Sequence, residues 1–138
     1  MILNTFQIRV RYADTDQMKR VYNGKFLEYF EIGRTELIRE LGLSYDGLEK
    51  KGFLLPVIEA YIKYFHPAEY DELLNIESSL RDKPLARLKI EYVIKAERDS
   101  RVIATGFTTH AFLDAQTLRV VRSPELFNNL IDKYFEEK

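Results

Sequence analysis

The sequence predicts an α+β protein in which one curved antiparallel sheet wraps around a single long central helix. The chain has 138 residues, 46% of them hydrophobic, which is the size of one compact domain. One long stretch carries apolar residues at helical spacing, and the other apolar stretches alternate with polar residues between short turns. Strands joined by short turns pair antiparallel, so we expect their common apolar face to cover the helix.

The first strand is predicted over residues 5–12. Phe6, Ile8 and Val10 fall on one side of this segment, and polar residues fall on the other. This alternation is typical of a half-buried strand. A polar stretch over residues 13–20 follows and is expected to form a loop.

The long helix is predicted from about Gly24 to Leu41. Apolar or small residues recur along it at spacings of three and four, namely Phe26, Phe30, Gly33, Leu37 and Leu41. Asn23 is a suitable N-cap and Gly42 a suitable C-cap. Gly33 lies in the apolar stripe, where its lack of a side chain lets the helix approach the sheet closely.

Four strands and a short helix are predicted after the long helix. The strands are Val57–Phe65, Leu73–Leu80, Ala86–Glu97 and Val102–Leu113. Ser123 is expected to cap a terminal helix that has Pro124 at its first position and runs to about Phe135. Because there is neither a low-complexity linker nor an internal repeat, residues 1–138 are predicted to form a single domain.

The composition excludes several classes of function. Lys plus Arg number 21 and Asp plus Glu number 22, a net charge of −1, so no nucleic-acid partner is expected. The chain has no Cys and only two His, which excludes thiol nucleophiles and a multi-histidine metal site within one subunit. No apolar run approaches the ~20 residues of a membrane span, and the N-terminus does not resemble a secretory signal. We therefore expect a cytoplasmic protein.

The segment RYADTDQMKRVYNG, residues 11–24, holds the candidate chemistry. It sets Asp14 and Asp16 just before the start of the long helix, where free amides and the helix dipole can hold an oxyanion. A carboxylate beside such an amide is suited to hydrolysing an ester or a thioester. Asp-Thr-Asp is also common in turns that have no catalytic role. The spacing alone does not decide between these readings, or between Asp14 and Asp16.

The resemblance of the chain to a known family bears on this choice. The stretches RYADTDQMKRVYNGKFLEYFEIGRTELIRELG, PVIEAYIKYFHPAEYDE and ATGFTTHAFLD resemble the 4-hydroxybenzoyl-CoA thioesterase family of hotdog-fold enzymes. They are similar in particular to its bacterial acyl-CoA thioesterase branch, which includes proteins associated with the Tol–Pal system. The resemblance implies a hotdog fold, a homodimer that pairs into a homotetramer, and sites at the subunit boundary.

The resemblance also implies an activity and two site residues. The activity is hydrolysis of an acyl-CoA or an acyl-carrier-protein thioester to a free acid and a thiol. CoA is then part of the substrate, and neither a metal nor an organic cofactor is needed. The catalytic carboxylate falls on Asp16, as nucleophile or general base, and the carbonyl-polarising backbone amide falls on Asn23.

Two further residues are candidates for substrate binding. Tyr22 stands beside the predicted helix start, where it either lines the acyl pocket or packs against the helix. Glu59 interrupts an otherwise apolar strand between Ile58 and Ala60. It is either a buried carboxylate near the site or a residue that points to solvent.

The sequence departs from the family pattern at three positions. Lys19 stands where the family usually has Gly, Asn23 where it has His, and Lys25 where it has Asn. These departures keep open an alternative, a non-catalytic acyl-CoA-binding scaffold. A dehydratase is disfavoured, because such enzymes usually use a site histidine and neither His66 nor His110 is expected near the helix start. His66 is predicted to lie in a turn, and His110 to be a satisfied or interface histidine.

Overall fold

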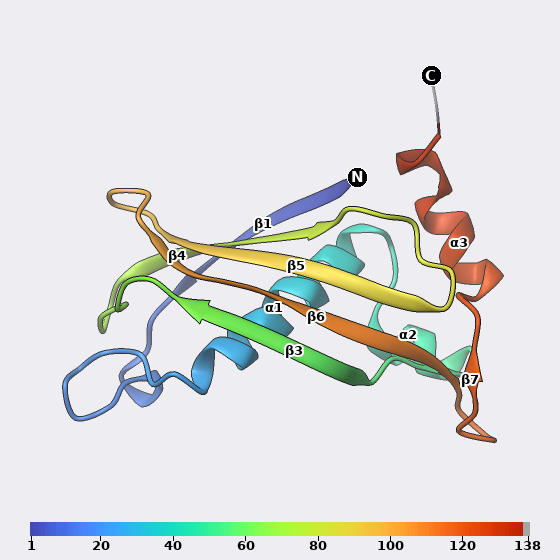
Figure 1. Cartoon of the computed structure of the whole chain (residues 1–138), viewed down its shortest axis with the longest axis horizontal. Coiled ribbons are helices and arrows are strands. Elements are labelled where there is room, and N and C mark those ends of the chain that lie inside the picture. Colours follow the sequence, from blue (N-terminus) through green and yellow to red (C-terminus); the bar gives the residue numbers. More distant parts are fainter. Residues whose placement is uncertain (137–138) are drawn as a thin grey trace.

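A computed structural model describes residues 1–136 and confirms the α+β hotdog fold (Figure 1). The strands are β1 Ile2–Arg9, β2 Phe53–Leu54, β3 Val57–Tyr64, β4 Leu73–Leu80, β5 Arg87–Ala96, β6 Val102–Asp114 and β7 Val120–Val121. The helices are α1 Lys25–Glu40, α2 Tyr45–Lys50 and α3 Glu125–Ile131, with 3-10 turns at Tyr12–Asp14 and Asp132–Tyr134.

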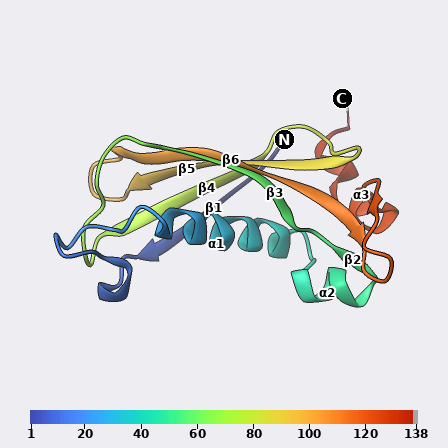
Figure 2. The same ribbon diagram turned by 60° about the horizontal axis from the view of Figure 1, so that its bottom comes forward.

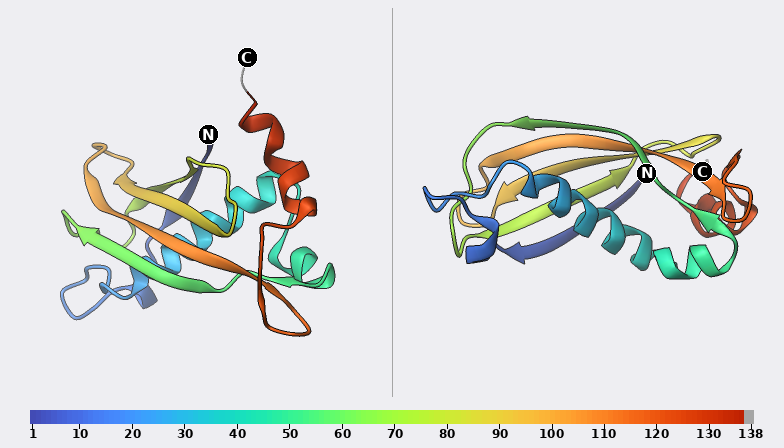
Figure 3. Two further views of the ribbon diagram at one scale, coloured as in Figure 1. Left: turned by 45° about the vertical axis from the view of Figure 1, so that its right-hand side comes forward. Right: turned by 90° about the horizontal axis from the view of Figure 1, so that it is seen from below.

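The fold has two layers, a curved sheet and the helix α1 along one of its faces (Figure 2). The strand order is β1-β4-β5-β6, with β3 on the far edge of β6, and every pairing is antiparallel. The view from below shows α1 running beneath the sheet, while α3 lies at one end of the molecule (Figure 3). Among residues 1–136, no helix lies along the opposite face of the sheet (Figure 2 and Figure 3).

The core forms where the apolar face of α1 meets the inward side chains of β4 and β5. The Phe30 and Tyr92 rings stack with their centroids 4.2 Å apart. Gly33 makes the close approach that its position predicts, because a Cβ atom there would lie 2.7 Å from Cγ2 of Ile76. The buried alternation predicted for the fourth strand is confirmed, since Leu88, Ile90, Tyr92, Ile94 and Ala96 are all buried.

Several predicted boundaries and caps are wrong. The first strand ends at Arg9, because the chain then turns into the 3-10 helix. The N-cap of α1 is Gly24 instead of Asn23, and it makes no side-chain capping bond. The N-cap of α3 is Pro124. Ser123 instead uses its hydroxyl to bond the Asn128 side chain at 2.7 Å.

Three short elements, α2, β2 and β7, were not predicted. The N-cap of α2 is Ser44, whose side chain accepts a hydrogen bond from the Gly47 amide. Strand β2 pairs with β6 through only two residues, and β7 does the same. All three are too short for hydrophobic periodicity to reveal them.

Strand β3 is an edge strand with an unusually apolar exposed surface. Its partner among the described strands is β6. Four of its large side chains are 43–51% exposed, namely Val57, Ile58, Tyr61 and Tyr64. Long apolar edges are normally covered in native proteins.

Within residues 1–136, no helix combines the length and the apolar character needed to cross a bilayer.

Candidate active site

The polar segment before α1 folds into a small hairpin that docks on the chain preceding β4. Thr15 and Val21 form an antiparallel bridge, and the Asp16 amide donates to the Arg20 carbonyl at 2.8 Å. The Val21 amide donates to the Ala68 carbonyl, also at 2.8 Å. The base of the hairpin is therefore held by the body of the protein, while its tip projects past the end of the sheet (Figure 1).

Asp16 lies in the tip of this hairpin. Oδ1 of its carboxylate accepts hydrogen bonds from the amides of Met18, at 2.8 Å, and Arg20, at 3.4 Å. The first of these closes an Asx turn. The Asp16 side chain is exposed, and Oδ2 has no hydrogen-bond partner among residues 1–136. The single chain thus presents the Asp16 carboxylate at its surface, and the catalytic role of Asp16 stays a prediction.

Lys19 occupies a turn position that suits glycine. Its φ angle is 61°, in the left-handed region, where a side chain costs roughly 1–2 kcal/mol. The Lys19 amide donates to the Asp16 carbonyl at 3.0 Å, and the Lys19 carbonyl accepts from the Tyr70 amide at 3.0 Å. The turn therefore holds a lysine in a conformation that favours glycine, at a conformational cost.

Asn23 borders a cavity at the start of α1. The cavity has a volume of about 270 Å³ and is lined by Val21, Asn23, Phe26, Tyr64, Phe65, His66 and Pro67. The Asn23 carbonyl accepts a hydrogen bond from the Tyr64 hydroxyl at 3.0 Å. Its amide has no partner within the described chain. A free amide at the positive end of a helix is suited to binding a carbonyl oxygen as negative charge develops on it.

His66 lines the same cavity, so the expectation that neither histidine lies near the helix start is wrong. The end of β3 reaches the start of α1, and His66 lies two residues beyond Tyr64, the last residue of the strand. Nδ1 of His66 is 2.9 Å from the Val102 carbonyl oxygen. Because a carbonyl only accepts, Nδ1 carries the proton in this bond, and Nε2 is the accepting nitrogen of the neutral ring.

Asp14 has an environment opposite to that of Asp16. Its carboxylate is buried and accepts hydrogen bonds from the Tyr29 hydroxyl at 3.0 Å and from the Arg11 amide and guanidinium at 3.2 Å each. Burial acts to raise the pKa of Asp14, but the bonds from Arg11 and Tyr29 outweigh it and hold the pKa below its ordinary value. A carboxylate held ionised by three donors is poorly suited to accept a proton or to attack a substrate.

Tyr22 and Glu59, the two candidates for substrate binding, lie apart from this cavity. The Tyr22 side chain is 57% exposed, and its ring covers Gly24, within 2.8 Å of the position of a Cβ atom there. Glu59 is exposed, and Oε1 of its carboxylate accepts a bond from Thr109 at 3.4 Å. Glu59 and Tyr64 are five positions apart along β3, which is about 16 Å of extended strand. Of the two alternatives for Glu59, the structure shows the solvent-exposed one within a single chain.

His110 is buried beneath the sheet in a hydrogen-bonded chain. Its Nε2 is 2.8 Å from the Thr108 hydroxyl, which is 2.6 Å from the Tyr92 hydroxyl. Its Nδ1 is 3.3 Å from the Leu55 carbonyl. Burial, aided by the nearby Arg34 charge, lowers the pKa of His110 to about 4. This is the satisfied core histidine that the sequence predicts.

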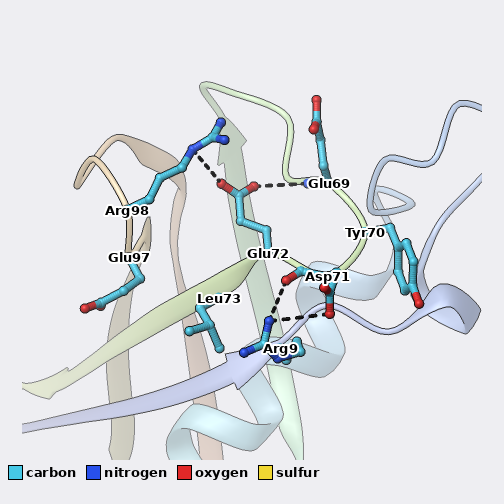
Figure 4. A pocket seen from close by; sticks show the side chains of 8 residues that line it. All are labelled: Arg9, Glu69, Tyr70, Asp71, Glu72, Leu73, Glu97 and Arg98. Carbon is cyan, nitrogen blue, oxygen red and sulfur yellow. Dashed lines mark hydrogen bonds and ion pairs between the residues drawn. The ribbon is translucent and has the colours of Figure 1, made fainter.

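A second cavity, of about 390 Å³, shares no lining residue with the cavity at Asn23 (Figure 4). It is lined by Arg9, Glu69, Tyr70, Asp71, Glu72, Leu73, Glu97 and Arg98. Arg9 pairs with Asp71 at 3.4 Å and Arg98 with Glu72 at 3.6 Å. Because these charges pair with one another across the connections around β4, the cavity lining is better explained by loop stability than by chemistry.

Comparison with known proteins places the chain beside thioesterases. A family model described as the thioesterase-like superfamily matches residues 10–131. YneP of Bacillus subtilis (strain 168), a proposed acyl-CoA thioesterase, is 45% identical to the chain over 76 residues. The match spans 55% of this chain and 55% of YneP. The acyl-CoA thioesterase YbgC of Haemophilus influenzae is 28% identical over 122 residues, 88% of each chain.

Solved structures agree with these relatives. A DHNA-CoA thioesterase from Staphylococcus aureus superimposes with a TM-score of 0.88 and 28% identity, over 98% of this chain and 90% of that one. A hypothetical protein from Thermus thermophilus gives a TM-score of 0.86 and 29% identity, over 94% and 97% of the two chains.

Proposed function

The chain belongs to the thioesterase-like superfamily, and from this membership we propose that it is an enzyme that hydrolyses the thioester bond of an acyl-CoA. The products are a free acid and the thiol of CoA. The observation that carries the proposal is the cavity at the start of α1, where the Asn23 amide is free. Relatives that are named acyl-CoA thioesterases support the reaction class.

The proposed mechanism uses two groups from residues 11–24. The thioester carbonyl lies over the first turn of α1 and accepts a hydrogen bond from the Asn23 amide, which stabilises the oxyanion. On one route the Asp16 carboxylate attacks the carbonyl carbon, the C–S bond breaks to release the CoA thiolate, and water then hydrolyses the mixed anhydride to the free acid. On the other route Asp16 takes a proton from the water that attacks, and the CoA thiolate leaves as the C–S bond breaks and receives that proton. Because a carboxylate, an amide and water suffice, the mechanism requires neither a metal nor an organic cofactor.

The proposed active unit is a homodimer that pairs into a homotetramer, in the cytoplasm. The support for assembly is β3, an edge strand that exposes Val57, Ile58, Tyr61 and Tyr64 to solvent. A second copy pairing along this edge buries these side chains and supplies the second wall that an open 270 Å³ cavity needs to hold an acyl group. Tyr22 and Glu59 keep their proposed contacts with substrate within that assembly.

The substrate is proposed at two levels. An acyl-CoA ester is the general class, and acyl-carrier-protein thioesters are a second donor to be tested. Aromatic acyl-CoAs, among them 4-hydroxybenzoyl-CoA, are the first substrates to test, because a DHNA-CoA thioesterase is 28% identical to the chain. We also propose that residues 1–138 form a single domain. The chain is further proposed to belong to the Tol–Pal-associated branch of acyl-CoA thioesterases.

The experiment measures thiol release from aromatic, short-chain and long-chain acyl-CoAs with three proteins. The wild type is compared with Asp16→Asn and with a control, Asp46→Asn, which neutralises an exposed carboxylate on α2. We expect turnover by the wild type and the control, and a loss of about 10²–10⁴-fold for Asp16→Asn. Tight binding of acyl-CoA by the wild type without thiol release would favour the alternative, a non-catalytic acyl-CoA-binding scaffold.

A further inference from the structure

The buried carboxylate of Asp14 is the most highly bonded side chain near the candidate site, and the proposed mechanism gives it no role. Its side chain is 4% exposed. Oδ2 accepts from the Tyr29 hydroxyl at 3.0 Å and from the Arg11 amide at 3.2 Å. Oδ1 accepts from the Arg11 guanidinium at 3.2 Å and lies 3.8 Å from Nζ of Lys25. A group with this many partners is built to hold a structure in place.

These partners come from both ends of the segment that carries the two proposed catalytic groups. Arg11 precedes the hairpin, while Lys25 and Tyr29 belong to the first two turns of α1. The main chain of Asp14 adds another tie, because its carbonyl accepts from the Tyr22 amide at 2.9 Å. Residues 14–25 therefore form a closed loop, and Asp14 is the point at which it closes.

Asp16 and Asn23 both lie inside this closed loop. Asp16 follows Asp14 by two residues, and Asn23 lies between Tyr22 and Lys25, two partners of Asp14. Asp14 itself lines a different cavity, of about 300 Å³, which shares no lining residue with the cavity at Asn23. Any influence of Asp14 on the reaction therefore passes through the loop instead of through contact with substrate.

We propose that Asp14 is a positioning residue that fixes the Asp16 turn relative to the free Asn23 amide. The inference rests on the proposed function, in which these two groups act on one thioester. It predicts that loss of the Asp14 carboxylate misplaces Asp16 without removing either group. A misplacement of about 1 Å is enough to cost roughly 10²-fold in rate.

The variants separate this role from a loss of stability. Asp14→Asn puts an NH₂ group among the donors of Arg11 and Tyr29, while the milder Tyr29→Phe removes one bond and keeps the carboxylate. A matched control is Thr108→Val, which breaks the buried Tyr92–Thr108–His110 chain, whose side-chain bonds involve no residue of the loop. All rates are expressed per folded molecule, from unfolding curves at the assay temperature.

The expected results concern kcat and the energetic coupling between substitutions at Asp14 and Asp16. Asp14→Asn lowers kcat by roughly 10–100-fold with little change in KM, Tyr29→Phe lowers it less, and Thr108→Val leaves it unchanged. In an Asp16→Asn background, Asp14→Asn changes the residual rate by less than about twofold, because the group it positions is already gone. Equal losses in both backgrounds would overturn the proposal.

Hydrogen exchange tests the positioning role without using activity. In Asp14→Asn, the amides of Val21 and Tyr22 are expected to exchange roughly tenfold faster or more, while those of β5 keep wild-type rates. If the wild type releases no thiol from any acyl-CoA, the proposed function fails, and the exchange rates alone decide on Asp14. Unchanged exchange and unchanged kcat in Asp14→Asn would refute the inference.

Discussion

The Tyr64 hydroxyl donates a 3.0 Å hydrogen bond to the Asn23 carbonyl, which joins the end of β3 to the start of α1. Removing this hydroxyl in Tyr64→Phe is expected to destabilise the fold by about 1 kcal/mol and to lower kcat, because the Asn23 peptide loses its anchor. Tyr61→Phe on the same strand is the control. Thiol-release kinetics and urea unfolding check the prediction, which fails if both variants behave alike.

The free energy of unfolding is expected to decrease as the pH is lowered through the range in which His110 titrates. Its pKa is about 4 in the folded state because the ring is buried, and about 6.5 in an unfolded chain. Between these values the unfolded chain binds a proton that the folded chain does not, so stability decreases as the pH falls. The predicted loss between pH 7 and pH 4 is about 3 kcal/mol at most, from 1.36 kcal/mol per unit.

Urea unfolding at pH 7, 6 and 5 measures this loss. His110→Gln is the comparison, because glutamine does not titrate and still hydrogen-bonds. Asp14 also makes stability depend on pH, but at lower pH than His110. Its pKa in the folded state is below 3.8, so the stability that it provides is lost only as the pH falls past that value. If the slope between pH 6 and pH 5 is the same in His110→Gln as in the wild type, this assignment is wrong.

The contact between α1 and the sheet predicts a severe effect of Gly33→Ala. The added methyl group would meet Ser78 and Ile76, so the helix must move, and overpacking of this kind typically costs about 1–3 kcal/mol. Gly47→Ala in α2 is the milder control, because its nearest contact, Ser44 Oγ at 3.1 Å, is relieved by a shift of a few tenths of an ångström. Thermal unfolding of both variants checks the prediction, and a Gly33→Ala protein as stable as the control would contradict it.

The exposed edge of β3 predicts the assembly state. If two chains pair along β3, the charge in Ile58→Lys falls on that interface and is expected to shift the protein toward the monomer. Light scattering after size-exclusion chromatography measures the mass, and Leu85→Lys, an exposed apolar residue outside the strands, is the control. A wild type that is monomeric at micromolar concentration would rule out pairing along β3.

The left-handed turn at Lys19 predicts a stabilising substitution. Glycine adopts a φ of 61° without the steric cost of a side chain, so Lys19→Gly should raise stability by about 0.5–1 kcal/mol after the entropy gain of the unfolded chain is subtracted. Lys51→Gly is the opposite case, because φ at Lys51 is −86°, and it should destabilise. Calorimetry of the two variants decides whether the turn is strained.

The long elements were predictable because their apolar residues repeat over many positions. Helix α1 has six buried residues and strand β5 has five, each set at the spacing of its element, and the predicted boundaries differ from the structure by only one residue at each end. Helix α2 has only six residues and contains Gly47, so its period is too brief to detect. Asn23 was misassigned as the N-cap because side-chain preference does not determine where the first helical residue falls.

The candidate site was less predictable, because its geometry depends on contacts between distant residues. The difference between Asp14 and Asp16 rests on two bonds from nearby Arg11 and on a third from Tyr29, whose hydroxyl reaches back fifteen residues. His66 joins the Asn23 cavity only because β3 runs back to the helix start. Spacing along the chain carries neither fact, so the sequence alone left the roles of the two carboxylates open.

The strand order has a consequence for synthesis on the ribosome. Strand β3 emerges about forty residues before β6, the strand it pairs with among the described residues, and β1 waits in the same way for β4. Helix α1 therefore leaves the exit tunnel long before most of the sheet that will cover it. At 5–20 residues per second, the apolar face of α1 stays exposed for seconds during synthesis. The nascent chain is therefore expected to bind chaperones in that interval.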